Sequence, residues 1–287
     1  MIRLPDFWSH HFAAKKADEK RRTTKPKHLV WSADFDNLYT FGAQGPDFFY
    51  YIGKFNPLSK HHYGDVGNQV HELDTRVLFQ EMLDFMIKTP SEALMAYISG
   101  FISHYIMDVH CHPLICLLGP DNTSHKRVEL DLEAFCVHDY WKISWHTLNV
   151  KAIKCNDNYL RQGYVELWQY LLPKCYHVSI KEVELLKGHV SMLRIQKLLV
   201  NDTLSHMPFL NVLTKLFNYD LSALRYPDVN DEALKTLREY KTFQDQYSKG
   251  IEETSKALIA LDSVLDGTIT VEHFIKTFIK YDFLGEA

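Results

Sequence analysis

The sequence has few cysteines, and no two of them are spaced as a metal-binding or redox pair. The five are Cys111, Cys116, Cys136, Cys155 and Cys175, an odd number that includes no Cys-x-x-Cys motif. This pattern argues against a disulfide framework and against a thiolate zinc site, since both require cysteines at characteristic spacings. We therefore expect reduced and mostly buried thiols, as in a cytoplasmic protein.

Long apolar runs and long basic blocks are missing as well. No stretch approaches the roughly 18 consecutive apolar residues of a membrane span, and residues 1–8 lack the apolar core of a signal peptide. These absences predict a cytoplasmic protein with no transmembrane segment. The net charge is −4, and the cluster Lys20-Arg21-Arg22 is too short for a nucleic-acid arm. The sequence therefore shows no clear nucleic-acid patch.

Helical patterns dominate the chain. It has 287 residues, of which 46% are hydrophobic, which is enough for a full core. Apolar residues recur at three- and four-residue intervals in most segments, and only residues 176–180 resemble a β-strand. Because repeats and linkers are also lacking, we predict a single all-α domain over residues 1–287, built as a multi-helix bundle.

Proline, glycine and capping residues predict where the helices begin and end. Ser91 is suited to cap a strongly apolar helix over 93–107, which we expect at the buried centre of the bundle. Breaks are predicted near Pro173, Pro208 and Pro227. The other predicted helices are 10–21, 68–88, 125–148 and 228–265, with loops at 53–67 and 113–124.

Histidine is the residue in excess, with 16 in the chain. His104, Asp108 and His112 are separated by four-residue steps, and His125 and Glu129 by another. Residues four apart lie on one face of a helix, so each pair can bind one metal ion, and imidazole with carboxylate suits zinc. A single pair would be the polar end of a core helix. Two pairs around a short loop favour a multinuclear metal site in the core of the bundle. We therefore describe residues 1–148 as the metal-site half, and residues 149–287 as a helical half without a recognisable function.

A turn before a cluster of aromatic residues presents a further carboxylate. Gly42, Gly45 and Pro46 lie within five residues, and they predict a turn that holds Asp47 in a fixed place. Phe48-Phe-Tyr-Tyr follows directly. These rings are able to line a pocket, but we expect at least half of them in the core.

Together these motifs resemble the zinc-dependent phospholipase C family, which includes bacterial phospholipases C and is related to fungal and plant single-strand nucleases. The motifs span roughly residues 1–145 and are Ser9-His10, Gly42-Ala-Gln-Gly-Pro-Asp47, Gly67-Asn-Gln-Val-His71, His104-x-x-x-Asp108-x-x-x-His112-Pro113 and His125-x-x-x-Glu129. The resemblance implies an all-helical fold with two or three zinc ions.

The resemblance also implies which residues hold each ion. The first ion would be held by Asp47, His71, His104 and Asp108, the second by His112, His125 and Glu129, and the third by His10 with Asp108 as a bridge to the first. Asp47 would lie beside the attacking water, as a ligand and candidate general base. His61, His62, His110 and His138 are alternative ligands; His61 or His62 would replace His71.

The third position departs from the family pattern. In secreted members a processed N-terminal tryptophan supplies its amine and carbonyl to the third ion. Trp8 is internal here and offers only an amide, which leaves His10 and Asp108, with His11 or water as additions. Because a catalytic zinc site usually has three protein ligands, we expect this position to bind most weakly.

The sequence thus predicts a zinc-dependent phosphoester hydrolase of the phospholipase C type. Its substrate would be a phospholipid or a small phosphodiester or phosphomonoester, attacked by a metal-activated water. One alternative is a His-Asp-dyad metal phosphohydrolase built on His138-Asp139. The other is a non-catalytic helical protein that the metal ions only stabilise. The sequence does not indicate an oligomeric state.

Overall fold

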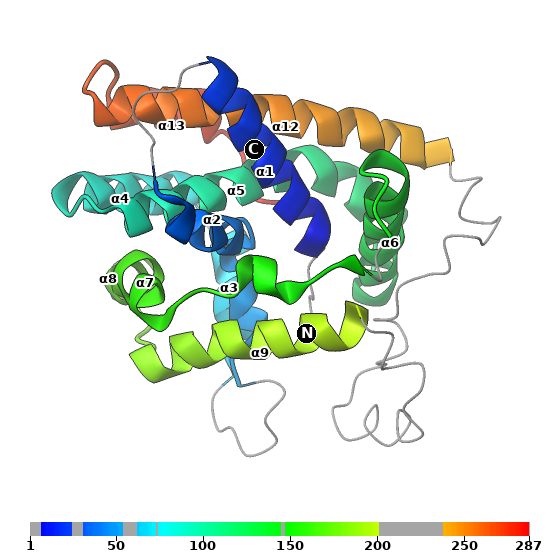
Figure 1. Ribbon diagram of the computed structural model, residues 1–287, viewed down its shortest axis with the longest axis horizontal. Coiled ribbons are helices and arrows are strands. Elements are labelled where there is room, and N and C mark those ends of the chain that lie inside the picture. Colours follow the sequence, from blue (N-terminus) through cyan, green and yellow to red (C-terminus); the bar gives the residue numbers. More distant parts are fainter. Residues whose placement is uncertain are drawn as a thin grey trace.

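The computed structural model describes residues 7–24, 31–53, 62–72, 74–144, 147–200 and 238–286, and all regular elements in these ranges are helical (Figure 1). This confirms the predicted all-α fold. The α-helices are α1 (Phe7–Thr24), α2 (Asp36–Gly42), α3 (Gly64–Glu72), α4 (Thr75–Lys88), α5 (Glu92–Leu118), α6 (Asn122–Phe135), α7 (Asp157–Leu160), α8 (Glu166–Cys175), α9 (Glu182–Val200), α12 (Arg238–Leu265) and α13 (Val271–Phe278). Short 3₁₀ segments are η1 (Ala33–Phe35), η2 (Gly45–Tyr51) and η5 (Val150–Ile153), and π-helical turns are η3 (Cys136–Tyr140) and η6 (Arg161–Val165).

Helix α5 lies at the centre of the bundle. The Ser91 side chain accepts a hydrogen bond from the Leu94 amide at 3.1 Å and caps its start, as predicted. Its most extensive contacts are with α12 and α2, and α1 also packs on it. By length and composition α5 is the one helix in the described ranges that could span a membrane. Most of its side chains lie in the protein core and three belong to the candidate site, so it packs as a core helix.

Glycines bring the backbones of α2 and α5 into direct contact. A Cβ atom on Gly42 would lie 2.2 Å from the Tyr97 carbonyl oxygen, and one on Gly100 would lie 2.0 Å from the Tyr39 carbonyl oxygen. Gly45 follows with φ +52°, and a Cβ there would lie 2.0 Å from the His104 ring. These close approaches place η2, which carries Asp47, against the His104 turn of α5.

The hydrophobic core includes side chains from both predicted halves of the chain. Trp8 from α1 and Tyr97 from α5 are buried with Trp168 from α8, Leu258 from α12 and Phe283 near the C-terminal end of the chain. The Trp168 indole donates a 2.8 Å hydrogen bond to the Tyr97 hydroxyl. The assignment of residues 1–287 to one domain stays a prediction.

The predicted loop 113–124 is wrong over its first half. Helix α5 continues through Pro113 to Leu118, and α6 begins at Asn122. A proline removes one intrahelical hydrogen bond, but Ile115 after it is only 2% exposed. Burial of this apolar turn outweighs the lost bond, which shows tertiary packing overriding a local helix breaker.

Other boundaries also differ from the prediction. Helix α3 begins at Gly64, inside the predicted loop 53–67, and the α-helix predicted to reach residue 148 ends at Phe135, followed by the π-helical turn. Residues 176–180 form no strand, and Pro173 lies inside α8 two residues before its end. The breaks at Pro208 and Pro227 and the start of the helix predicted for 228–265 lie outside the described residues.

Candidate metal centre

The structure brings all of the predicted ligands to one place in the bundle. Helix α5 supplies His104, Asp108 and His112, α6 supplies His125 and Glu129, and α1, η2 and α3 supply His10, Asp47 and His71. Most of them line a cavity of about 30 Å³. The ligand atoms fall into three groups suited to hold metal ions: first Asp47–His71–His104, second His112–His125–Glu129 and third His10–His104–Asp108.

The first group has the spacing of a zinc site. The His71 Nε2 atom lies 3.3 Å from Asp47 Oδ1, and the His104 Nε2 atom lies 3.8 Å from Asp47 Oδ2. Two atoms that each bind zinc at about 2.1 Å lie roughly 3.4 Å apart in tetrahedral geometry. The gap between these side chains therefore fits one such ion.

The second group has similar spacing at the junction of α5 and α6. The His125 Nε2 atom lies 3.0 Å from Glu129 Oε1, and the His112 Nε2 atom lies 3.6 Å from the same oxygen. The other oxygen, Oε2, accepts a 3.2 Å hydrogen bond from Lys126, whose side chain is buried. Lys126 thereby holds the carboxylate so that Oε1 faces the two imidazoles.

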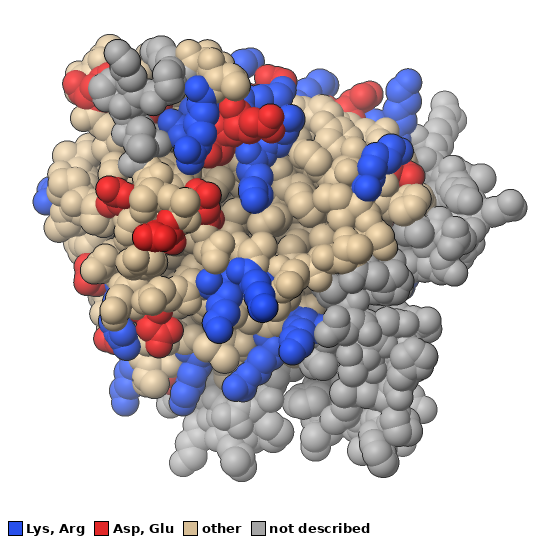
Figure 2. Space-filling view, in the orientation of Figure 1, with Lys and Arg blue, Asp and Glu red and all other residues tan. Residues whose placement is uncertain are grey.

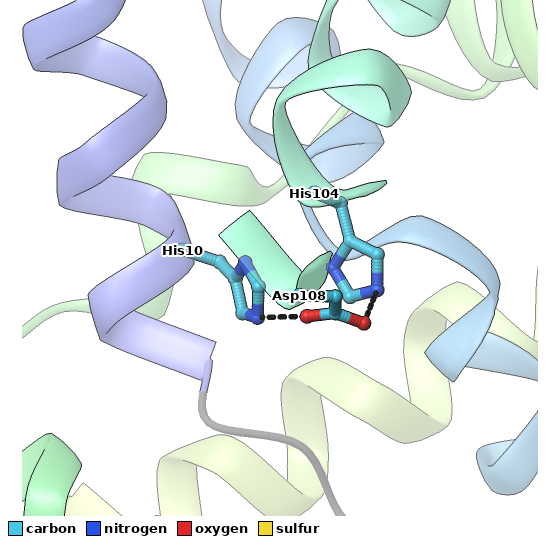
Figure 3. Close-up of side chains that lie close together, drawn as sticks. All are labelled: His10, His104 and Asp108. Carbon is cyan, nitrogen blue, oxygen red and sulfur yellow. Dashed lines mark ion pairs between the residues drawn. The ribbon is translucent and has the colours of Figure 1, made fainter. Parts of the chain in front are cut away.

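Asp108 faces two histidines from different helices with its two oxygens (Figure 3). Oδ1 lies 3.1 Å from His10 Nε2, and Oδ2 lies 3.1 Å from His104 Nε2. This geometry suits a carboxylate that bridges two ions. His104 belongs to two of the groups, but one nitrogen binds one ion, so the His10 position is left with fewer ligands of its own.

Backbone carbonyls fix which ring nitrogen faces the cavity in three of the histidines. The Nδ1–H groups of His71, His104 and His112 donate to the carbonyls of Gly67, Ala43 and Phe283 at 2.7, 3.2 and 2.8 Å. A carbonyl oxygen only accepts, so each Nδ1 carries a proton, and each Nε2 is the atom turned towards the carboxylates. This outer hydrogen bond is the usual partner of a metal-bound histidine.

His104 provides the sharpest test of whether the residues fit a metal. Its Nε2 atom is buried and makes no hydrogen bond, yet it lies beside oxygens of Asp47 and Asp108. A neutral His104 would point its Nε2 lone pair at two carboxylates, and this is unfavourable unless positive charge lies between them. A zinc ion supplies that charge, so the donor set fits the predicted metal.

Two carboxylates of the site, Asp108 and Glu129, remain ionised despite their burial. Burial alone would raise the pKa of Asp108, but His104 and His112 outweigh it and hold the pKa well below its usual range. Burial likewise opposes ionisation of Glu129, and Lys126 and His112 again hold the pKa well below normal. The two buried negative charges make the cavity attractive to cations.

The start of α1 is tied to α6 rather than to the predicted third ion. The amides of Trp8 and Ser9 donate to the buried carboxylate of Glu133 on α6, the second at 3.4 Å. Trp8 therefore uses its amide in a protein contact. His11, proposed as an additional ligand, packs its ring against Trp8 and Phe12, and burial with Lys15 lowers its pKa to about 3.

The alternative histidines that the structure describes, His62, His110 and His138, do not join the groups. His62 is exposed, and His61 lies outside the described residues. His110 pairs with Glu253 of α12 at 3.0 Å. His138 is exposed and pairs with its neighbour Asp139 at 2.8 Å, and in the described ranges no third ligand joins this pair. The geometry therefore favours His71 at Asp47 and gives the His-Asp-dyad alternative no site.

Comparison with known proteins identifies the family. The sequence model of a family described as zinc dependent phospholipase C matches residues 9–175, more than half of the chain and all of the candidate ligands. The chain belongs to the zinc-dependent phospholipase C family. The match runs past residue 145, where the recognisable motifs end, to Cys175 at the end of α8. No curated protein and no solved structure matches the chain.

The surroundings of His71 and Asp47 complete the description of the site. The helix predicted over 68–88 is divided into α3 and α4, and His71 lies one residue before the end of α3. The aromatic residues that follow Asp47 are all fully buried, in line with the expectation that at least half lie in the core, and they are Phe48, Phe49, Tyr50 and Tyr51. The neighbours of Asp47 thus anchor η2 in the core.

The site also contains residues that sequence reasoning missed. The Tyr247 hydroxyl, on α12, donates a 2.5 Å hydrogen bond to the Ser9 carbonyl beside His10 and accepts one from Trp141 at 3.1 Å. The Phe283 ring packs against His71 and His104. These contacts join residues far apart in sequence and leave no local signal. Lys126 and Glu133 did have a local signal in the sequence, because each lies about one helical turn from Glu129.

Replacement of a ligand should lower zinc content and zinc-dependent stability together. We expect His104→Ala and Glu129→Ala each to bind at least one ion fewer per chain, because each loses a group that only the folded protein positions. Elemental analysis of protein purified without chelator, and melting temperatures with and without zinc, measure both effects. His138→Ala is the matched control and should resemble wild type. Unchanged zinc content in the ligand variants would contradict the assignment.

Removal of residues 281–287 should weaken zinc binding through the loss of the Phe283 carbonyl. That carbonyl orients His112, and loss of such an outer partner typically costs about 10–100-fold in metal affinity. Phe283→Leu keeps the carbonyl and should retain near-normal affinity. Zinc competition against a chromogenic chelator, on samples shown to be folded by circular dichroism, compares the two. If the two variants bind zinc with equal affinity, residues 281–287 contribute only packing and do not orient His112.

Proposed function

We propose that this chain hydrolyses phosphoesters by the phospholipase C reaction, with a phospholipid as the preferred substrate class. The observation that supports it most is the set of three ligand groups around one small cavity, in a chain of the zinc-dependent phospholipase C family. In this reaction water attacks phosphorus, the bond to the glycerol oxygen breaks, and the phosphorylated head group and a diacylglycerol are released.

Zinc ions bound by these residues would lower the pKa of a bound water and bind phosphate oxygens. The side chains of the protein would orient the attacking water and hold the proton that it releases. Asp47 is 4% exposed and fixed by the Gly45-Pro46 turn, with both oxygens directed at the imidazoles of His71 and His104. From this position it would orient the attacking water and accept its proton.

The substrate class can be tested with a panel of phosphoesters. Zinc-loaded protein would be assayed on phospholipids with different head groups, on soluble phosphodiesters and phosphomonoesters, and on single-stranded DNA. We expect release of a phosphorylated head group from phospholipid. Zinc-loaded protein that turns over none of these substrates would favour the non-catalytic alternative, in which the ions only stabilise the bundle.

Substitution of Asp47 should affect turnover more than substrate binding. Asp47→Asn keeps the shape of the side chain but removes its basic oxygen, and general base catalysis is typically worth about 10²–10⁴-fold in rate. We therefore expect kcat to fall by about this factor with little change in KM. Asp139→Asn, at a half-buried position outside the three ligand groups, serves as the control. Near-normal kcat with a raised KM would instead make Asp47 a substrate-binding residue.

A further inference from the structure

The outer face of α9 combines basic and apolar side chains. Its solvent-exposed stripe consists of Val183, Lys187, Val190, Arg194 and Lys197, which recur at three- and four-residue intervals. The two valines are 52% and 41% exposed. None of the five is acidic, and the two valines lie on either side of Lys187 in the stripe. The stripe therefore has the composition of a helix that lies in the interfacial region of a membrane.

Two more lysines extend this stripe. Lys151 in η5 and Lys154 directly after it are exposed, and η5 is fixed to α9 because His189 donates a 3.0 Å hydrogen bond to the Ile153 carbonyl. Figure 2 shows basic side chains gathered over this part of the molecule, where Figure 1 places α9 in yellow-green. We call these seven residues the α9 surface, namely Lys151, Lys154, Val183, Lys187, Val190, Arg194 and Lys197.

The acidic residues at the start of α9 are engaged in other contacts. Glu182 accepts a 2.6 Å hydrogen bond from Arg161, and Glu184 accepts one from the Tyr63 hydroxyl at 3.1 Å. Neither lies in the exposed stripe. The positive charge of the α9 surface is therefore not cancelled by its own helix.

The inner face of α9 packs on the segment that carries Asp47. A Cβ on Gly188 would lie 2.6 Å from the Ile52 side chain and 3.7 Å from the Phe48 carbonyl oxygen. Gln196 donates a 3.2 Å hydrogen bond to the Tyr51 hydroxyl. One helix thus separates η2 from the α9 surface, so a partner bound there would contact the helix that packs on the segment carrying Asp47.

We propose that the α9 surface docks this protein on an anionic phospholipid bilayer. Its five cations complement acidic head groups, each adding about 1 kcal/mol of attraction, and its two valines can insert between the head groups. A nucleic acid would be bound by cations with stacking aromatic side chains, and the stripe holds valines instead. This inference rests on the proposed function, because a phospholipid substrate must be reached at a bilayer.

Vesicle flotation tests the docking surface without relying on activity. Zinc-loaded wild type, the variant Lys187→Gln/Arg194→Gln/Lys197→Gln, and the control Lys241→Gln/Lys249→Gln/Lys256→Gln would be mixed with phosphatidylcholine vesicles with or without phosphatidylserine. The control removes the same charge from exposed lysines on α12. We expect wild type to bind the anionic vesicles, the α9 variant to bind them about 100-fold more weakly, and the control to lose less than about tenfold.

Three outcomes would overturn the inference. They are absence of wild-type binding to anionic vesicles, equal weakening of the two triple variants, and tighter binding to single-stranded RNA that depends on the same α9 residues. Turnover of a soluble short-chain phosphoester should be the same in all three proteins. Absence of that turnover in wild type would reject the proposed function. The flotation result would still decide whether the α9 surface binds anionic bilayers.

Discussion

The buried carboxylate of Asp108 is the constraint on which the rest of this structure depends. It is 3% exposed in the most apolar helix of the described chain and remains ionised. A charge buried without partners destabilises a protein by several kcal/mol. His10 and His104 face its two oxygens, and His112 lies 3.7 Å from it. The helices around α5 must therefore be placed so that positive charge meets this carboxylate.

Segments from both ends of the described chain meet at this carboxylate. Helix α1 brings His10, the segment around Phe283 orients His112, and Tyr247 of α12 holds the backbone next to His10. The family match ends at Cys175, so Tyr247 and Phe283, which hold the site's geometry, lie beyond the matched residues. The predicted ligands lie in the first half of the chain, and the second half helps to hold their geometry.

Local signals explain what could be predicted from the sequence. The four-residue steps from His104 to His112 fix one helical face, and the Gly45-Pro46 turn fixes Asp47, so these groupings were accessible. Pro113 failed as a helix breaker because burial of the following turn outweighed a local preference. Tyr247 and Phe283 had no local signal, because each meets the site only through contacts spanning 171 residues or more.

The most direct measurement is a crystal structure of the zinc-loaded protein with anomalous diffraction recorded at the zinc edge. We expect one peak between Asp47, His71 and His104 and another between His112, His125 and Glu129, each about 2.0–2.2 Å from the ligand atoms. A weaker third peak is expected between His10 and Asp108. Zinc bound only at surface histidines such as His138, with no peak in the cavity beside Asp108, would contradict the assignment of this cluster as a metal centre.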